Sequence, residues 1–248
     1  IASRIEQMAQ VLAGGVDKVP KHLTIQHLHS LAREIFCDDT GLQFQAILDP
    51  EMRAEIESAM GLRIMGSLTP AFLQAEWKHV IDYWGISDLE SYQTHDRPGR
   101  GTALGRRQKE DLWSIFGPVL QNIAATKGRL TFHQLAFAAA RIAKDKPEVR
   151  FRHVIVDEVQ DFGPAEITLI RSITPPETDD LFLCGDAGQQ IYRRPFSWNS
   201  LGVQIQGRSR HLSSNYRNSK QIQELDDMVM GAPPVGGDGE PVERRAVS

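Results

Sequence analysis

The feature that most constrains the fold is a nine-residue stretch, H-V-I-V-D-E-V-Q-D, which runs from His153 to Asp161. Residues 154–156 are all β-branched, and a short apolar run of this kind predicts a strand covered on both faces, as in a parallel sheet. The run ends in two carboxylates, Asp157 and Glu158. Ligands of open α/β sheets gather at the carboxyl ends of strands, and Mg²⁺ is commonly held by one or two carboxylates and substrate phosphates. The stretch therefore predicts a magnesium-nucleotide site, with a solvated loop or helix cap as the simpler alternative.

The composition is that of an ordinary soluble protein. Of 248 residues, 41% are hydrophobic and 24% are charged, and the net charge of −4 gives no overall sign of nucleic-acid binding. The two cysteines, Cys37 and Cys184, are far apart, which favours a reducing compartment and provides no disulfide or metal framework. No apolar run approaches the roughly 18 residues of a membrane span, and no secretory signal is present. A cytoplasmic protein is expected, and the start at Ile1 inside a predicted helix suggests a piece of a longer polypeptide.

The N-terminal residues predict a helix, a strand and a second helix. Apolar residues at helical spacing up to residue 14 predict a helix that packs one face on a sheet. Residues 23–25 are a strand candidate, and the apolar stripe that starts at Leu28 predicts the second helix. His29 and Ser30 lie at this strand-to-helix junction, where hydrogen bonding within the junction is their simplest role.

Residues 38–125 are interpreted as a helical insertion in an α/β domain. Helical patterns recur around residues 72–84 and 112–123, and no strand-like alternation is evident. Between these helices, a glycine-containing segment from Arg97 to Lys109 is rich in basic residues. It either tracks a phosphate backbone or forms a solvated loop that caps helices. It is not a P-loop, because it lacks the G-x-x-x-x-G-K-[ST] pattern and no strand precedes it.

The α/β pattern returns after this insertion. Thr131 and Gln134 fit a capping box that opens a helix to about residue 144. A further helix is expected after Gly163-Pro164, because proline is tolerated in the first turn. The segment L-F-L-C, which ends at Cys184, predicts a second buried strand, and that strand again leads to an acid.

Local charge is more informative than net charge near the C-terminus. Residues 187–223 contain no acidic residue, while basic residues are interleaved with aromatic ones. This pattern suits phosphates and stacked bases of a single-stranded nucleic acid.

Three segments in order resemble the UvrD/Rep/PcrA-type superfamily 1 DNA helicases. D-E-V-Q-D at 157–161 is similar to the Walker B motif of that family, G-D-A-G-Q-Q-I-Y at 185–192 to its motif III, and N-Y-R at 215–217 to its motif IV. H-L-H-S-L-A at 27–32 resembles the weaker motif Ib, with His27 in place of the usual threonine.

The resemblance implies an α/β fold of the RecA-like P-loop NTPase type, with a parallel sheet and an inserted helical subdomain. It implies that the first RecA-like domain comprises residues 1–37 and 126–207, and that the insertion comprises residues 38–125. The start of a second RecA-like domain, with a tail, then occupies residues 208–248.

The resemblance also implies roles around ATP. Asp157 would hold Mg²⁺, and Glu158 would bind that ion and polarise the attacking water. Gln189 would sense the γ-phosphate, Arg217 would reach it as an arginine finger, and Tyr216 would stack on the adenine. These roles fit phosphoryl transfer, which depends on positioning and charge stabilisation.

Further residues of the same motifs are implied beside the nucleotide and on the DNA. Gln160 and Asp161 would couple the site to motif III, and Asp186 of motif III is expected near the cofactor. On the DNA side, the resemblance implicates five residues, namely His29, Ser30, Tyr192, Arg194 and Trp198.

Besides His27, the sequence departs from the family pattern in two further ways. Arg194 stands where an aromatic residue often stacks on a base, although arginine itself stacks on bases. The Walker A lysine loop and motifs V and VI do not occur in residues 1–248. The chain by itself is therefore expected to hydrolyse ATP negligibly.

The favoured function is an ATP-dependent helicase or translocase that uses ATP and Mg²⁺ on single-stranded or tailed duplex DNA, with DNA repair as the family-level expectation. One alternative is a nucleic-acid-binding module without catalysis. Another is a Mg²⁺-dependent nuclease that uses Asp157, Glu158 and Asp161. Polarity, DNA or RNA preference and oligomeric state stay open.

Overall fold

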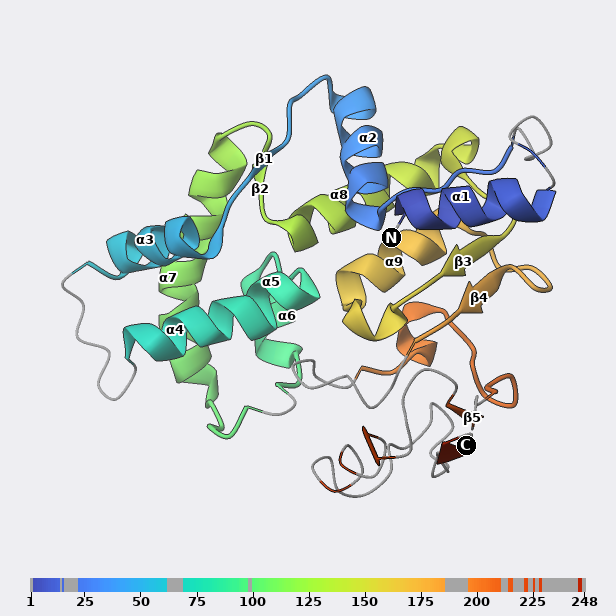
Figure 1. Cartoon of the computed structure of the whole chain (residues 1–248). Helices are drawn as coiled ribbons and strands as arrows, with labels where there is room; N and C mark the ends of the chain where they lie inside the picture. Colours follow the sequence, from blue (N-terminus) through green and yellow to red (C-terminus); the bar gives the residue numbers. More distant parts are fainter. Residues whose placement is uncertain are drawn as a thin grey trace.

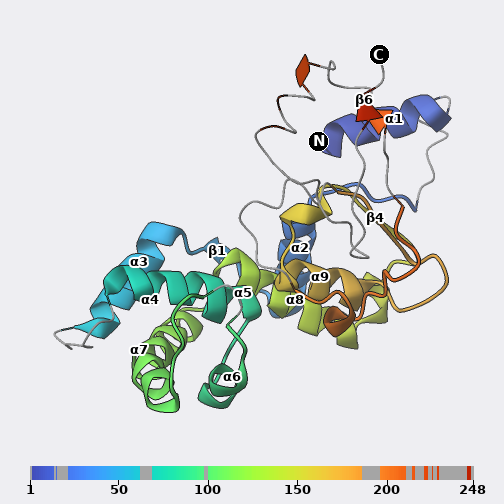
Figure 2. The same cartoon turned by 90° about the horizontal axis from the view of Figure 1, so that it is seen from below.

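The structure is a computed structural model, and it describes residues 2–13, 15, 22–61, 69–97, 100–185, 196–210, 214–215, 221–222, 225, 228 and 245–246. Two groups of helices are visible, one containing α3 to α7 and one containing α2, α8 and α9 beside two strands (Figure 1; Figure 2).

The N-terminal elements are α1 (Ala2–Ala13), α2 (Leu28–Thr40), β1 (Gln45–Ala46), α3 (Asp49–Met60), α4 (Pro70–Glu76), the π-helical turn η2 (Trp77–Ile81), α5 (Asp82–Trp84) and α6 (Leu89–Thr94). The elements that follow are α7 (Arg106–Ala125), β2 (Arg129–Leu130), α8 (Phe132–Asp145), η3 (Pro147–Val149), β3 (Val154–Val156), η4 (Val159–Asp161), α9 (Pro164–Ile173), β4 (Leu181–Leu183), η6 (Asn199–Leu201), β5 (Ser214–Asn215) and β6 (Arg245–Ala246).

The predicted strands at 154–156 and 181–183 form and are parallel. Val154, Ile155 and Val156 pair with Leu181, Phe182 and Leu183 in register. The other described strand pairs, β1 with β2 and β5 with β6, are also parallel. The parallel pairing is therefore confirmed, and the described part of the chain is mostly helical with small parallel sheets.

The prediction that these strands are covered on both faces is wrong for the described part of the chain. Strand residues alternate between faces, so the register partners Ile155 and Phe182 lie on one face, where they are 79% and 64% exposed. Val156 lies on the opposite face and packs with Ile167 and Ile170 of α9. Cys184, predicted to be a buried strand residue, follows the last residue of β4 and is exposed.

The apolar core is divided into clusters that follow the two groups of helices. The buried residues of one cluster all lie between Ile47 and Ile123, mostly in α3 to α7. Another joins α2, α8 and α9, and a third joins α9, β3, β4 and residues 196–205. The predicted helices at 72–84 and 112–123 are confirmed, whereas β1 and its pairing with β2 were not predicted.

Two predictions for the N-terminal residues are wrong. Residues 23–25 form no strand. Residues 2–13 do form α1, but Ile5, Met8 and Val11 of its apolar stripe are exposed rather than packed on a sheet. In contrast, the predicted capping box is present, because Thr131 Oγ1 accepts a hydrogen bond from Gln134 N and Gln134 Oε1 accepts one from Thr131 N.

Three cations of the basic segment at residues 97–109, which leads into α7, point inward. Glu76, which is fully buried, accepts hydrogen bonds from Arg97 Nε at 2.5 Å and from Arg100 Nε at 3.0 Å. The two arginine side chains are only 7% and 13% exposed. Lys109 donates to the carbonyls of Tyr92, Gln93 and His95 at the end of α6. Lys109 thus caps the end of α6, as one of the two interpretations expected, whereas Arg97 and Arg100 pair with a buried glutamate, which neither interpretation expected.

Candidate functional site

The acidic pair lies where it was predicted, directly after β3. Asp157 and Glu158 follow Val156 at the carboxyl end of the strand, and both are exposed. The end of β4 lies beside them, because Cys184 N donates to Val156 O at 2.8 Å and Val159 N donates to Cys184 O at 2.9 Å. The start of the motif III segment, Gly185, is thereby held against the segment that carries the carboxylates.

Glu158 has an unusual backbone conformation. Its φ of 54° and ψ of 39° place it in the left-handed region, where Asp179 is the only other non-glycine residue of the described chain. Such a conformation costs on the order of 1–3 kcal/mol and occurs preferentially at functional sites. Two hydrogen bonds hold it, one from Glu158 N to Asp157 Oδ1 at 3.0 Å and one from Asp161 N to Glu158 O at 2.9 Å.

Gln160 bridges the acidic pair and the end of β4. The side chain is buried, and its Nε2 donates to Glu158 Oε2 at 2.5 Å. A Cβ added at Gly185 would lie 2.5 Å from Gln160 Oε1 and 3.1 Å from Gln160 N. Only glycine therefore fits at position 185 while Gln160 keeps this place. The role of Gln160 as a coupling residue stays a prediction, but its contacts join the two segments that the role requires.

The donor set suits a magnesium ion bound with a nucleotide. Asp157 and Glu158 offer carboxylate oxygens at the solvent-accessible end of parallel strands. Mg²⁺ prefers oxygen ligands and usually keeps waters and substrate phosphates in its shell. Two exposed carboxylates are compatible with such partial coordination.

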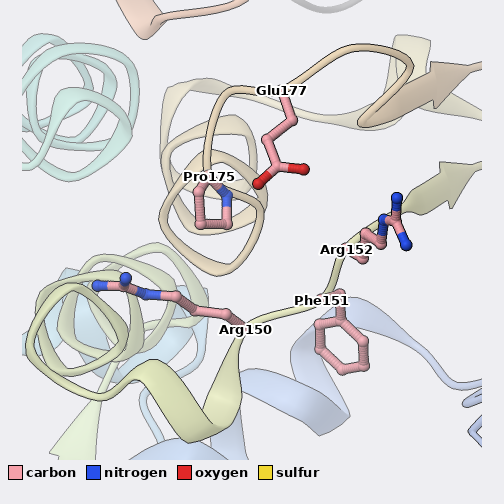
Figure 3. A pocket seen from close by; sticks show the side chains of 5 residues that line it. All are labelled: Arg150, Phe151, Arg152, Pro175 and Glu177. Carbon is pink, nitrogen blue, oxygen red and sulfur yellow. The ribbon is translucent and has the colours of Figure 1, made fainter.

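A surface hollow of about 380 Å³ lies at the other end of the same strands. It is lined by residues that precede β3 and β4, namely Arg150, Phe151, Arg152, Pro175 and Glu177. Figure 3 shows the two arginines pointing away from each other, with no group of side chains converging on the hollow. This hollow therefore does not belong to the candidate site.

His29 is connected to the segment after the acidic pair by buried polar side chains. His29 Nε2 lies 3.3 Å from Glu166 Oε1, and His133 Nε2 lies 3.9 Å from the same oxygen. His133 Nδ1 in turn lies 2.9 Å from Asp82 Oδ2. We refer to His29, Glu166, His133 and Asp82 as the polar junction. Ser30, the neighbouring candidate for DNA contact, is exposed.

Glu166 is charged in this setting. Burial by itself would raise its pKa, but the hydrogen bond with His29, the charge of His133 and the backbone N–H of Gly163 outweigh burial and lower it to about 2. A glutamate with a lowered pKa contributes stability that is fully present above its unfolded-state pKa, here 4.5, and is lost as the pH falls towards the folded value.

We expect this contribution to be visible in acid. Between about pH 5 and pH 2 the chain should lose on the order of 3 kcal/mol of unfolding free energy through Glu166, beyond the loss due to other carboxylates. The measurement is urea unfolding at several pH values for the chain and for Glu166→Gln. The variant should be less stable at pH 6 and show a flatter pH dependence. Parallel curves for the two proteins would contradict the assignment.

Six of the predicted site residues lie outside the described residues, so their predicted roles are not tested by the structure. They are Asp186, Gln189, Tyr192, Arg194, Tyr216 and Arg217. Trp198 is described and half-buried, and its ring lies 5.2 Å from that of Phe196 within the cluster under β3 and β4. Base stacking by Trp198 stays a prediction.

Glu166, His133 and Asp82 were not predicted as functional residues. Each has a local interpretation in the sequence, since Glu166 is the third residue of α9 and caps Gly163 N at 2.8 Å. His133 follows the capping threonine, and Asp82 lies inside a helical stripe. Their convergence joins residues up to 137 positions apart, so only the tertiary structure reveals it.

Comparison with known proteins agrees with the motifs. The family model for the UvrD/REP helicase N-terminal domain matches residues 3–194. An ATP-dependent helicase/nuclease subunit of Pediococcus pentosaceus is 25% identical over 123 residues, which cover 42% of this chain and 10% of that protein. The protein of the same name from Latilactobacillus sakei subsp. sakei is 29% identical over 91 residues, or 32% of this chain and 10% of that protein. The matched region is thus about a tenth of the length of these relatives.

No described helix has both the length and the apolar character needed to cross a membrane.

Proposed function

Because the chain belongs to the UvrD/REP helicase N-terminal domain family, we propose that it is part of an ATP-driven motor that moves on DNA. The family fold is RecA-like, and the parallel strands β3 and β4 with α8 and α9 fit its sheet and covering helices. We further propose that the helices between residues 38 and 125 are a subdomain inserted in this domain, and that residues 208–248 begin a second RecA-like domain.

The observation that carries the proposal is the geometry after β3. A strained glutamate stands beside an aspartate at a strand end, and Gln160 connects it to the first glycine of the motif III segment. This arrangement suits a site that must respond to the terminal phosphate of a nucleotide and transmit the response to a neighbouring strand.

In the proposed mechanism, Asp157 and Glu158 would hold Mg²⁺, which would supply positive charge to the phosphates of a bound nucleotide. Glu158 orients the attacking water and accepts its proton. Gln160 fixes the carboxylate of Glu158 through the hydrogen bond to Oε2. Gln189 and Arg217 are proposed to contact the γ-phosphate, and Tyr216 to stack on the adenine.

Single-stranded or tailed duplex DNA is the proposed track. His29 and Ser30 lie in the first turn of α2 and are proposed to contact its backbone. Tyr192, Arg194 and Trp198 are proposed to stack on bases, which contributes about 1–3 kcal/mol per base in such proteins. Family membership favours DNA repair and a cytoplasmic location, both as proposals.

A nuclease is the second candidate, because the names of both relatives include that activity. The present chain offers little for it. Two-metal cleavage needs a cluster of ligands, and the described residues contain no group of three or more histidines, cysteines or acids suited to a metal. Nicking of supercoiled plasmid with Mg²⁺ and without ATP would favour the nuclease.

The experiment for the proposed function uses the complete polypeptide that carries this chain. ATP hydrolysis should increase on addition of single-stranded DNA, and streptavidin should be displaced from a biotinylated end only when ATP is hydrolysed. The 248-residue chain alone should hydrolyse ATP negligibly, since the lysine loop that cradles phosphates is not among its residues. DNA binding that is sensitive to salt but unaccompanied by hydrolysis in the complete polypeptide would favour a binding module.

A further inference from the structure

The polar junction brings together three helices at one buried carboxylate and extends through His133 to a fourth. Glu166 of α9 has a side chain that is 3% exposed and meets His29 of α2 and His133 of α8. His133 continues the contacts to Asp82 of α5, whose other oxygen accepts a hydrogen bond from Thr131 Oγ1 at 2.5 Å. The junction therefore connects the helices beside the sheet with the helical region between residues 38 and 125.

Glu166 divides its two oxygens between two tasks. Oε2 accepts the N–H of Gly163 at 2.8 Å, which fixes the N-cap of α9 two residues after Asp161. Oε1 faces the ring nitrogens of His29 and His133. A helix cap needs only the first contact, whereas burial of a carboxylate is costly unless it is paired. The contacts of Oε1 with the two histidines are therefore additional to ordinary helix capping.

His29 combines a buried anchor with an exposed side. One of its nitrogens faces Glu166, yet 41% of the side chain is exposed. The ring also meets that of Phe132 edge-on, with centroids 5.2 Å apart. Two contacts of different kinds thus set the position and tilt of an imidazole in the first turn of α2.

The opposite end of the junction lies in an irregular helix. Asp82 follows directly on η2, a π-helical turn, and such turns are rare and often occur at functional sites. The next residue, Tyr83, packs so closely on Gly163 that an added Cβ would lie 2.6 Å from its ring. The α5 region therefore contacts both Glu166's helix and the residue that Glu166 caps.

We propose that Glu166 is a positioning residue that holds His29 for contact with single-stranded DNA and ties this contact to the segment carrying Asp157 and Glu158. A displacement of α5, or of a DNA strand bound at His29, would therefore shift the start of α9. The inference rests on the proposed function, since it requires that His29 contacts DNA.

The test is a double-mutant cycle on DNA affinity. Binding of the complete polypeptide to a fluorescein-labelled oligothymidylate is measured by anisotropy for wild type, His29→Ala, Glu166→Gln and the double variant. Each single change should weaken binding by about three- to tenfold, and the double variant should be no weaker than the worse single one, because the two residues act as a unit. The ring ¹⁵N shifts of His29 should move in Glu166→Gln.

A matched control separates positioning from loss of stability. Asp180, also buried, pairs with Arg171 at the other end of α9 at 2.6 Å. Asp180→Asn should lower the unfolding midpoint yet leave DNA affinity and the His29 shifts unchanged. If Glu166→Gln does not fold, Asp82→Asn takes its place in the cycle with the same expected non-additivity.

The measurements distinguish failure of the positioning role of Glu166 from failure of the proposed DNA contact of His29. If His29→Ala binds DNA like wild type, the proposed DNA contact fails and the inference fails with it. If His29→Ala weakens binding but Glu166→Gln does not, or if the two effects multiply, the positioning role is overturned while the proposed function stands.

Discussion

Replacing Glu158 by glutamine is expected to leave ATP binding nearly intact and to reduce DNA-stimulated hydrolysis by about 10²–10⁴-fold, the usual contribution of a positioned general base. Glutamine keeps the size of the side chain and can still meet Gln160, but it cannot accept a proton from the attacking water. The turnover number and the Kd of a fluorescent ATP analogue would be measured in the complete polypeptide that carries this chain.

Asp179→Asn is the control for this substitution. Asp179 is the other described non-glycine residue with a positive φ, at 57°, and it lies before β4, at the far end of the strands from Glu158. Its replacement should leave turnover unchanged. Hydrolysis by Glu158→Gln within threefold of wild type would show that the water is activated elsewhere.

Replacing Glu76 by glutamine should cause a large loss of stability. The carboxylate is fully buried and receives Arg97 through two bonds, Nε at 2.5 Å and Nη2 at 2.6 Å, and Arg100 and the Tyr92 hydroxyl at 3.0 Å and 2.9 Å. Burial favours the neutral acid, but the bonds and charges of these partners outweigh it and lower the pKa of Glu76. Without the charge, two buried guanidinium groups are uncompensated, which typically costs about 3–5 kcal/mol.

An exposed ion pair in the same group of helices is the matched comparison. Lys78 and Asp49 are 2.6 Å apart, but their side chains are 57% and 80% exposed. Asp49→Asn should therefore change the unfolding free energy by less than about 1 kcal/mol. Urea unfolding of the 248-residue chain, followed by circular dichroism, measures both. Equal effects of the two substitutions would mean that the buried cluster does not stabilise these helices.

Much of the fold follows from local sequence patterns. The helices α2, α8 and α9 were predicted from apolar spacing and from capping residues such as Thr131 and Gln134, because these signals act within a few residues. Local patterns do not determine whether a strand is buried on both faces. Val154 to Val156 suggested two buried faces, yet Ile155 is exposed, since burial depends on which distant segments pack on each face.

Of the candidate site, only the features encoded locally in the sequence were predicted. Asp157 and Glu158 were found from their place after an apolar run, which is local information. The left-handed conformation of Glu158, the buried contacts of Glu166 and the inward orientation of Arg97 and Arg100 depend on partners far away in the chain. Charge alone suggested phosphate binding for those arginines, but both pair with one buried glutamate, Glu76.

We propose that the acidic pair after β3 holds the metal of a bound nucleotide. The most direct test of this claim is Mn²⁺ binding, followed by electron paramagnetic resonance, in the complete polypeptide with a non-hydrolysable ATP analogue. Wild type should bind one Mn²⁺ per nucleotide, and Asp157→Asn should lose this nucleotide-dependent signal. Unchanged Mn²⁺ binding by Asp157→Asn would contradict the claim.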